Sequence, residues 1–129
     1  MTNSQRGFTL IELICAMLIL TVCLLALVQM TTHSIYNNTW GSDNVISTRL
    51  AQNKIAQLKS GGYAALATGN YTDANNPIDA QGNAGGYYTR TWSIATGPTT
   101  GTMQITVTIT WRGGAHQTSF STLMANPGT

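Results

Sequence analysis

The carboxylate of Glu12 is the first feature of this sequence that needs a chemical explanation. It directly precedes residues 13–30, a run of 18 residues without a charged side chain. Placing an ionised carboxylate in the centre of a bilayer costs at least roughly 2.5–3.5 kcal/mol. Glu12 could avoid this cost at headgroup level, where water reaches it and no partner is needed. Alternatively, it could compensate a positive charge on another chain.

The other residues that could do chemistry are dispersed. His33 and His116 lack metal-ligand spacing. Cys15 and Cys23 are eight residues apart in the apolar run, about 12 Å along a helix, so they cannot bond each other there. We interpret them as packing or lipid-facing residues. No phosphate-binding loop, nucleophile elbow or catalytic carboxylate pair is present. The sequence predicts no enzyme activity, no catalytic residue and no cofactor.

One segment, residues 61–86, is rich in Gly, Asn and Asp. Four of its oxygen-bearing side chains are candidate calcium ligands: Asp73, Asn75, Asn76 and Asp79. Pro77 and a missing glycine break the pattern of an EF-hand loop. We therefore interpret these residues as turn formers and predict no metal site.

The composition restricts the class of protein further. The chain has 129 residues and 13.8 kDa, which allows one modest core. Charged residues make up 8%, and the net charge of +2 is too small for a nucleic-acid surface, so no nucleic acid is expected as a partner. Two cysteines cannot form a disulfide-rich scaffold.

The first seven residues, MTNSQRG, are polar and end in Arg6-Gly7; FTLIEL follows at 8–13. Over residues 7–13 the chain resembles the type IV prepilins and the pseudopilins of type II secretion. Their hallmark is a short basic leader ending in Gly, then Phe-Thr-Leu-Ile-Glu and an apolar run. The resemblance implies that prepilin peptidase cuts between Gly7 and Phe8 and methylates the new amino group of Phe8. It also implies that Glu12 pairs with the Phe8 amine of a neighbouring subunit.

The leader also bears on topology. A secretory signal peptide fits poorly, because the apolar run is long and no small-residue cleavage site follows it. Arg6 favours a cytoplasmic leader. The resemblance implies a single-pass inner-membrane protein with its soluble domain in the periplasm, which then enters a pilus or pseudopilus filament at the cell surface. Its partners would be prepilin peptidase, other pilin or minor pilin subunits, the inner-membrane assembly platform and membrane lipid.

A helix must carry these residues, and we expect it to run from Phe8 to about Lys59. Residues 8–30 would form its transmembrane half and residues 31–60 its amphipathic half. An apolar stripe predicts where the second half packs: Tyr36, Trp40, Leu50, Ala51 and Leu58. Asp43 and Lys54 fall on the same side, so the stripe is imperfect. Gly61-Gly62 is a stop signal.

Beyond the helix, residues 61–86 are expected to form a long surface loop and residues 87–129 an antiparallel sheet domain. We predict three strands, at 87–95, 103–111 and 117–124. In the second strand, alternate residues from Met103 to Trp111 are apolar, and the intervening ones are Gln or Thr. Phe120 and Leu123 are the expected apolar anchors of the third strand, which a tight turn at 112–115 joins to the second. The fold class is α+β: a long N-terminal helix packed on a small antiparallel sheet, which the resemblance identifies as the pilin fold.

Two weaker patterns, Arg90–Ile94 with the following Thr-rich strand and residues 52–58, resemble V-type minor pilins and I-type pseudopilins. Major pilins usually carry a proline within the helix, but no proline occurs in residues 1–76, and Gln29 stands at the expected position. These features favour a minor pilin or a pseudopilin over a major pilin. We expect a minor pilin that primes or joins a type IV pilus, with a type II secretion pseudopilin as the alternative. A membrane-anchored adhesin or ligand-binding module, which would keep residues 1–7, is the alternative of another class.

Overall fold

The computed structural model describes residues 7–128, so the predicted leader lies outside the described residues except for Gly7. The chain divides into two compact units, Met1–Trp40 and Gly41–Thr129. One helix, α1 (Leu10–Ser60), contributes to both units. It begins two residues after the expected start and ends one residue after the expected end, so its predicted extent is confirmed.

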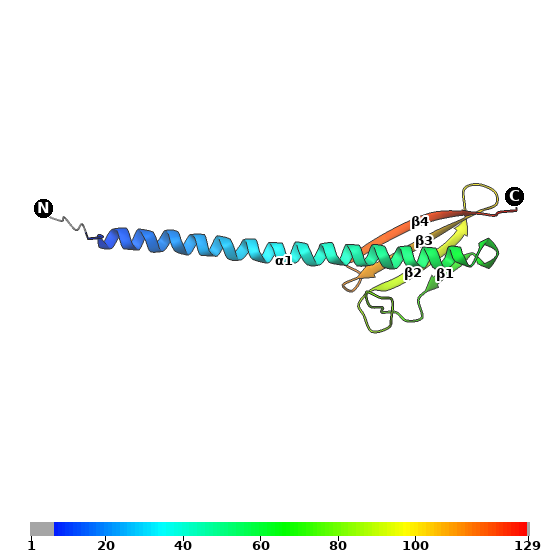
Figure 1. The fold of residues 1–129 in the computed structure, drawn as a ribbon, viewed down its shortest axis with the longest axis horizontal. Helices are drawn as coiled ribbons and strands as arrows, with labels where there is room; N and C mark the ends of the chain where they lie inside the picture. The colour runs from blue at the N-terminus through cyan, green and yellow to red at the C-terminus, as the bar shows by residue number, and fades with distance from the viewer. Residues whose placement is uncertain (1–6, 129) are drawn as a thin grey trace. The chain divides into compact units, whose positions relative to one another are not determined.

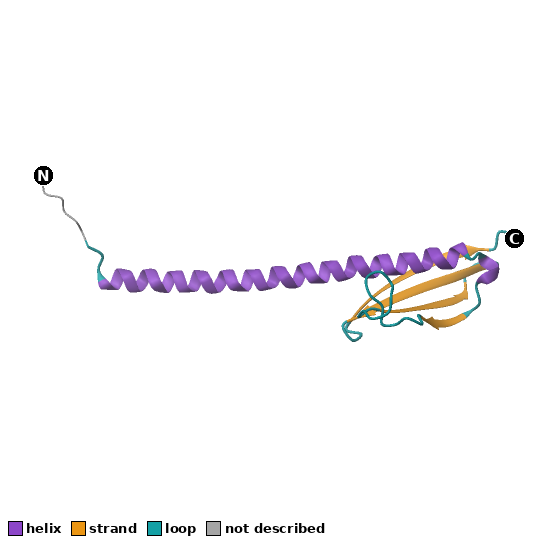
Figure 2. Ribbon diagram, turned by 60° about the horizontal axis from the view of Figure 1, so that its bottom comes forward, coloured by secondary structure: helices purple, strands orange, loops and turns teal. Residues whose placement is uncertain are grey.

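The second unit consists of the end of α1, a short 3₁₀ helix η1 (Tyr63–Ala65) and a four-stranded sheet. The strands are β1 (Gly69–Thr72), β2 (Thr89–Thr96), β3 (Thr102–Trp111) and β4 (His116–Ala125). Their order is β1-β2-β3-β4, with every neighbouring pair antiparallel. Figures 1 and 2 show the end of α1 lying over one face of this sheet. The predicted α+β class is confirmed.

Strand β1 is the main difference from the prediction. The segment expected as a surface loop contains both η1 and this strand, so the sheet has four strands rather than three. The sequence Gly-Asn-Tyr-Thr is too short to show alternation, and all four residues are exposed. Pairing with β2, which places Tyr71 opposite Trp92, specifies the strand.

The core lies between the sheet and α1. Ile105, Val107, Ile109 and Trp111 are buried on one face of β3, while the alternate residues face away, as the sequence predicted. Strand β4 alternates in the same way, and Phe120 packs against the core. The prediction for Leu123 is wrong: its side chain is 50% exposed on the other face. Residues three apart in a strand point to opposite faces, so Phe120 and Leu123 cannot both reach the core.

The buried residues of α1 begin at Asp43 and continue at helical spacing through Ser47, Leu50 and Ala51. The predicted stripe therefore holds in its second part, and Leu58 also packs against the core. Tyr36 and Trp40, its expected first members, are 53% and 45% exposed and belong to the first unit.

Candidate functional site

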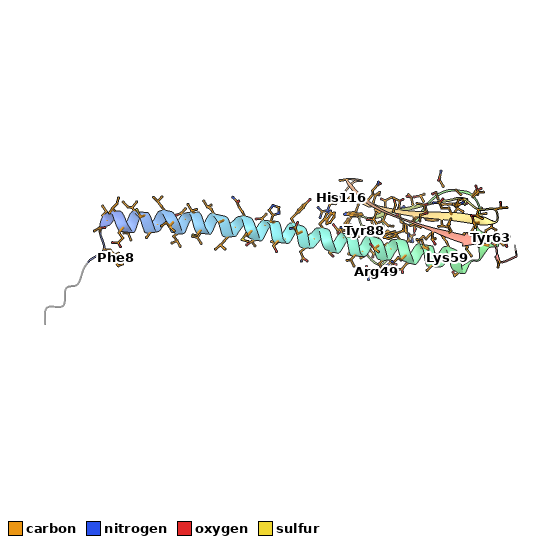
Figure 3. The ribbon with its side chains drawn as sticks, turned by 90° about the horizontal axis from the view of Figure 1, so that it is seen from above. Phe8, Arg49, Lys59, Tyr63, Tyr88 and His116 are labelled. Carbon is orange, nitrogen blue, oxygen red and sulfur yellow. The ribbon has the colours of Figure 1, made fainter. Side chains whose placement is uncertain are left out.

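Gly7 and Phe8 lie just before α1, in a segment without regular secondary structure. A side-chain carbon added to Gly7 would meet nothing within 4 Å, so packing in the described residues does not require glycine here. The Phe8 side chain is 85% exposed, at the start of the ribbon in Figure 3. An enzyme could therefore reach the peptide bond between them. Cleavage at this bond and methylation of Phe8 remain predictions.

Thr9 caps the first turn of the helix. Its hydroxyl oxygen accepts a hydrogen bond from the Glu12 backbone N–H at 3.4 Å, and its carbonyl accepts one from Leu13 N–H at 3.2 Å. Thr9 and Glu12 have the spacing of a capping box, Thr-x-x-Glu. A carboxylate in the first turn also interacts favourably with the helix dipole. Glu12 is thus compatible with the helix start on structural grounds alone.

The Glu12 side chain is exposed. It takes part in neither of the two ion pairs found within residues 7–128. Both ion pairs lie in the second unit, between Arg90 and Asp73 and between Arg112 and Asp43. Pairing with an amine of another chain would use a carboxylate that no described cation occupies. This pairing is still a prediction.

The following segment of α1 is apolar on every side. Figure 3 shows side chains projecting all around this part of the helix, and each residue of 10–30 is exposed. Its most apolar window of 18 residues has a mean hydropathy of 2.8, so α1 is long and apolar enough to cross a membrane. The Thr21 hydroxyl donates to the Met17 carbonyl at 2.8 Å, which removes an unpaired donor from the apolar segment. Cys15 and Cys23 are exposed free thiols, in agreement with their interpretation as surface residues of this segment.

A buried polar cluster joins α1 to the sheet in the second unit. Asp43 is 3% exposed and accepts hydrogen bonds from the hydroxyls of Tyr87 and Tyr88 on one carboxylate oxygen. Arg112, in the turn between β3 and β4, donates to the other oxygen at 3.2 Å. The two tyrosine rings stack with their centroids 4.4 Å apart. Three donors therefore hold one carboxylate of the helix against the sheet.

These contacts determine the protonation of the cluster. Burial alone would raise the pKa of Asp43, but the bonds from Tyr87, Tyr88 and Arg112 outweigh it and lower this pKa. Burial, together with the bonds to Tyr87 and Asp43, raises the pKa of Tyr88 far above its usual value. At neutral pH the cluster therefore contains a carboxylate, a guanidinium and two neutral phenols, which favours a fixed position over proton transfer.

Lys54, the second polar residue on the stripe, also has a partner in the sheet. Its Nζ lies 3.9 Å from the centroid of the Trp92 ring, a cation–π contact. The ring of Tyr71 on β1 also stacks with that of Trp92, and the two ring centroids are 5.8 Å apart. Burial, followed by repulsion from Arg90, lowers the pKa of Lys54. The contact ties α1 to the edge of the sheet near β1.

Three of the four candidate calcium ligands, Asp73, Asn76 and Asp79, use their side chains in structural bonds. Asp73 pairs with Arg90 on β2, and Asp79 accepts backbone hydrogen bonds from Gln81 and Asn83, both at 2.9 Å. The Asn76 side chain bonds both the N–H and the C=O of Arg90, each at 2.8 Å. Among the described residues no group of three or more His, Cys, Asp or Glu side chains could hold a metal ion. Their interpretation as turn formers agrees with these bonds.

Sequence reasoning missed several of these roles, although signals were present. The capping role of Thr9 follows from the Thr-x-x-Glu spacing. Asp43 and Lys54 were read as defects of the apolar stripe, but a polar residue on a buried face indicates a partner in the packed element. Tyr87 and Tyr88 were assigned to a strand, whereas both precede β2 and act through their hydroxyls. The identity of these partners has no local signal, because they lie 44 and 45 residues from Asp43.

Comparison with known proteins identifies the N-terminal segment. No curated protein and no solved structure matches the chain. The family model of the prokaryotic N-terminal methylation motif matches residues 2–28, from the leader through the apolar part of α1. The match includes Gly7, Phe8 and Glu12, the residues that the sequence selected. The chain thus carries the class III signal found in type IV pilin-like and pseudopilin-like proteins. Pilin-like proteins that carry this signal are structural subunits.

Proposed function

We propose that this chain is a minor pilin of a type IV pilus, processed by prepilin peptidase between Gly7 and Phe8 and then assembled into, or priming, the filament. One observation carries the proposal: the methylation motif leads directly into a helix segment whose residues are all exposed. Such a segment needs lipid or other helices around it. Membrane anchoring before assembly, and helix packing afterwards, would meet this need in turn.

Glu12 would set the axial register of the helix in the filament. A charge in an apolar medium costs several kcal/mol unless it is paired. The amine of Phe8, created by cleavage, would lie four residues before Glu12 in each mature chain. At one particular displacement along the filament axis, the Phe8 amine of a neighbouring subunit would meet Glu12. At any other displacement, the amine and the carboxylate would both stay unpaired.

The first experiment measures the mature N-terminus by mass spectrometry of the chain isolated from peptidase-competent cells. A chain beginning with methylated Phe8 is the expected result, while an intact Met1 would contradict the proposal. Gly7→Leu is expected to leave the full-length precursor in the membrane. Because Gly7 has no packing neighbour, this substitution leaves the described fold unchanged. Efficient cleavage of the Gly7→Leu chain would show that the cleavage site lies elsewhere.

The second experiment separates pairing by Glu12 from helix capping. Glu12→Gln removes the charge with the shape nearly kept, Glu12→Asp keeps the charge, and Thr9→Ala removes the cap alone. We expect Glu12→Gln to be inserted and cleaved but to enter filaments poorly, with partial recovery in Glu12→Asp. Thr9→Ala should enter filaments nearly normally. Equal loss in Thr9→Ala and Glu12→Gln would assign the effect to the helix start instead.

The pseudopilin alternative shares every step up to assembly. The uninterrupted helix, which has no proline from Leu10 to Ser60, fits a minor pilin and a pseudopilin equally well. Recovery of the chain in sheared surface pili supports the minor pilin. Loss of type II secretion on deletion, with surface pili intact, would favour the pseudopilin.

A membrane-anchored ligand-binding module is the proposal of another class, and one feature favours it. The face of the sheet opposite the helix has a hollow of about 390 Å³, lined among others by six uncharged polar residues: Asn70, Thr72, Thr91, Ser93, Thr106 and Thr108. This module would keep its leader, so the mass of the N-terminus distinguishes it from a pilin.

A further inference from the structure

The two outer strands of the sheet have unpaired backbone edges. Strand β4 pairs with β3 through ten consecutive residues without a bulge, and β1 pairs with β2 through four. Within residues 7–128, no other backbone hydrogen bond involves residues of either outer strand. Each strand therefore presents a row of free N–H and C=O groups on its outer side, which is a template for another strand.

Neither edge carries a charged side chain or a proline, although β1, with four residues, is short for an outer strand. Proteins block such edges with charged side chains, prolines, bulges or a covering element. No charged residue and no proline occurs in Gly69–Thr72 or His116–Ala125. All eight charged residues after Trp40 lie on α1, on β2 or in the connecting segments. Both edges are thus free of charge and proline, which leaves each able to pair with another strand.

The strand directions identify a suitable partner. Four successive antiparallel strands make β1 and β4 run in opposite directions. A second copy in the same orientation therefore brings its β1 antiparallel to β4 of the first. Antiparallel pairing of β4 with another β4 would instead reverse the second copy. Pairing of β4 with β1 keeps every sheet unit in one orientation, as equivalent subunits of a filament require, so the argument rests on the assembly proposed above.

We propose that the outer edge of β4 pairs with the outer edge of β1 in a second copy of this chain. The interface is head-to-tail, so each copy keeps one free edge and the sheet continues from subunit to subunit. It would add a second contact, between soluble units, to the packing of the N-terminal helices.

The side chains favour one register. In the sheet, Tyr71, Trp92, Val107 and Phe120 form a single cross-strand row on the helix side. Placing Tyr71 of the second copy opposite Phe120 continues this row with an aromatic pair. On the face of the sheet away from the helix, the same register sets Thr72 of the second copy opposite Ser119 of the first. It also sets Asn70 of the second copy opposite Ser121 of the first. Those hydroxyl and amide groups extend the hydrogen-bonded pairs that β3 and β4 already make, such as Thr108 with Ser119 at 2.8 Å.

Disulfide trapping tests the register in the full-length chain in native membranes. Cys15 and Cys23 are first replaced by Ala, and two differently tagged chains are co-expressed, one with Thr72→Cys and one with Ser119→Cys. A mild thiol oxidant should yield a disulfide dimer carrying both tags. In the matched control, Thr108→Cys replaces Ser119→Cys, because Thr108 lies in the same row on a central strand. That control should give no mixed dimer.

Charge substitution at the second pair tests the same contact without cysteine chemistry at the altered site. Asn70→Lys is added to the Thr72→Cys chain and Ser121→Lys to the Ser119→Cys chain, which sets like charges opposite each other. The yield of the disulfide-linked mixed dimer should then fall roughly fivefold. Asn70→Lys with Ser121→Glu should restore it. Asn70 and Ser121 are exposed in the structure, so neither change disturbs the core.

The result that overturns the proposal is a mixed-dimer yield no higher than in the Thr108→Cys control. A Ser119→Cys chain that forms dimers with itself as readily would also overturn it, in favour of β4–β4 pairing. The N-terminal mass is measured on the same sample. Methylated Phe8 without mixed dimers means that this proposal alone fails, whereas mixed dimers with Met1 retained mean that the edges pair although the proposed function is wrong.

Discussion

The Asp43 cluster allows the sharpest test of how α1 is held on the sheet. Asp43→Ala removes the carboxylate and leaves the hydroxyls of Tyr87 and Tyr88 and the guanidinium of Arg112 without this acceptor. Tyr88 is 1% exposed, so its hydroxyl cannot turn to bulk water. The substitution is therefore expected to lower the free energy of unfolding of the second unit strongly.

The magnitude follows from the three bonds that are lost. A hydrogen bond to a charged group contributes about 1.5–3 kcal/mol, but bonds that share one acceptor are not additive. Arg112 and Tyr87 are exposed and can turn to water, so we take about 1.5–3 kcal/mol, the contribution of the buried bond from Tyr88, as the estimate. A domain of about 90 residues has a stability of roughly 4–13 kcal/mol, so the loss is a measurable share of the total. It corresponds to a fall in Tm of at least about 6 °C.

The assay is thermal unfolding of the full chain in detergent, followed by near-UV circular dichroism of the aromatic core. Asp79→Ala is the matched control, because Asp79 is only partly buried and its side chain bonds only within its own turn. A double-mutant cycle with Tyr88→Phe should give a coupling energy of about 1.5–3 kcal/mol between Tyr88 and Asp43. A fall in Tm below about 4 °C for Asp43→Ala, equal to that of the control, would refute the reasoning.

Three further predictions concern the second unit. Gly41→Ala should raise the stability of α1 by about 0.5–1 kcal/mol, measured by chemical denaturation, because the added methyl group meets nothing within 4 Å; a loss would contradict this. Leu123→Thr should change Tm little while Ile109→Ala costs about 2–5 kcal/mol, since only Ile109 is buried; equal effects would reverse our assignment of faces. The pKa values of Asp43 and Asp73 are lowered by folding, so their stabilisation is complete above the unfolded pKa of about 4 and is lost as the pH falls through the folded values. Acid titration of unfolding should show this loss in the parent chain and less of it in Asp43→Asn.

Local patterns determined the parts of the fold that the sequence predicted. The 18 uncharged residues of 13–30, the Gly61-Gly62 stop and the alternation in β3 each specify an element without help from distant residues. Gly7, Phe8 and Glu12 could be selected as candidates for the same reason, because their motif is contiguous, and their roles stay predictions. The start of the sheet-packing part of α1 was misplaced, since Tyr36 and Trp40 continue the helical spacing but belong to the first unit.

The parts that were missed depend on tertiary pairing. Strand β1 is defined by Tyr71 lying against Trp92, and four exposed residues have no periodicity to reveal this. Arg90 combines an ion pair to Asp73 with backbone bonds to Asn76, and only the folded loop brings these groups together. The exposure of Leu123 was, in contrast, predictable from strand geometry. Because side chains alternate along a strand, Leu123 and Phe120 point to different faces of the sheet.

The meander order of the sheet also has a kinetic consequence. Each strand pairs with its neighbour in sequence, so the sheet can form by successive short loop closures, beginning at the four-residue turn between Trp111 and His116. Docking of α1 closes much longer loops, because Asp43 is 44 residues from Tyr87 and 69 from Arg112. The apolar face of the sheet thus remains uncovered until the helix docks. In a nascent chain, the interval between these two events is when the unit is most exposed to aggregation and proteolysis.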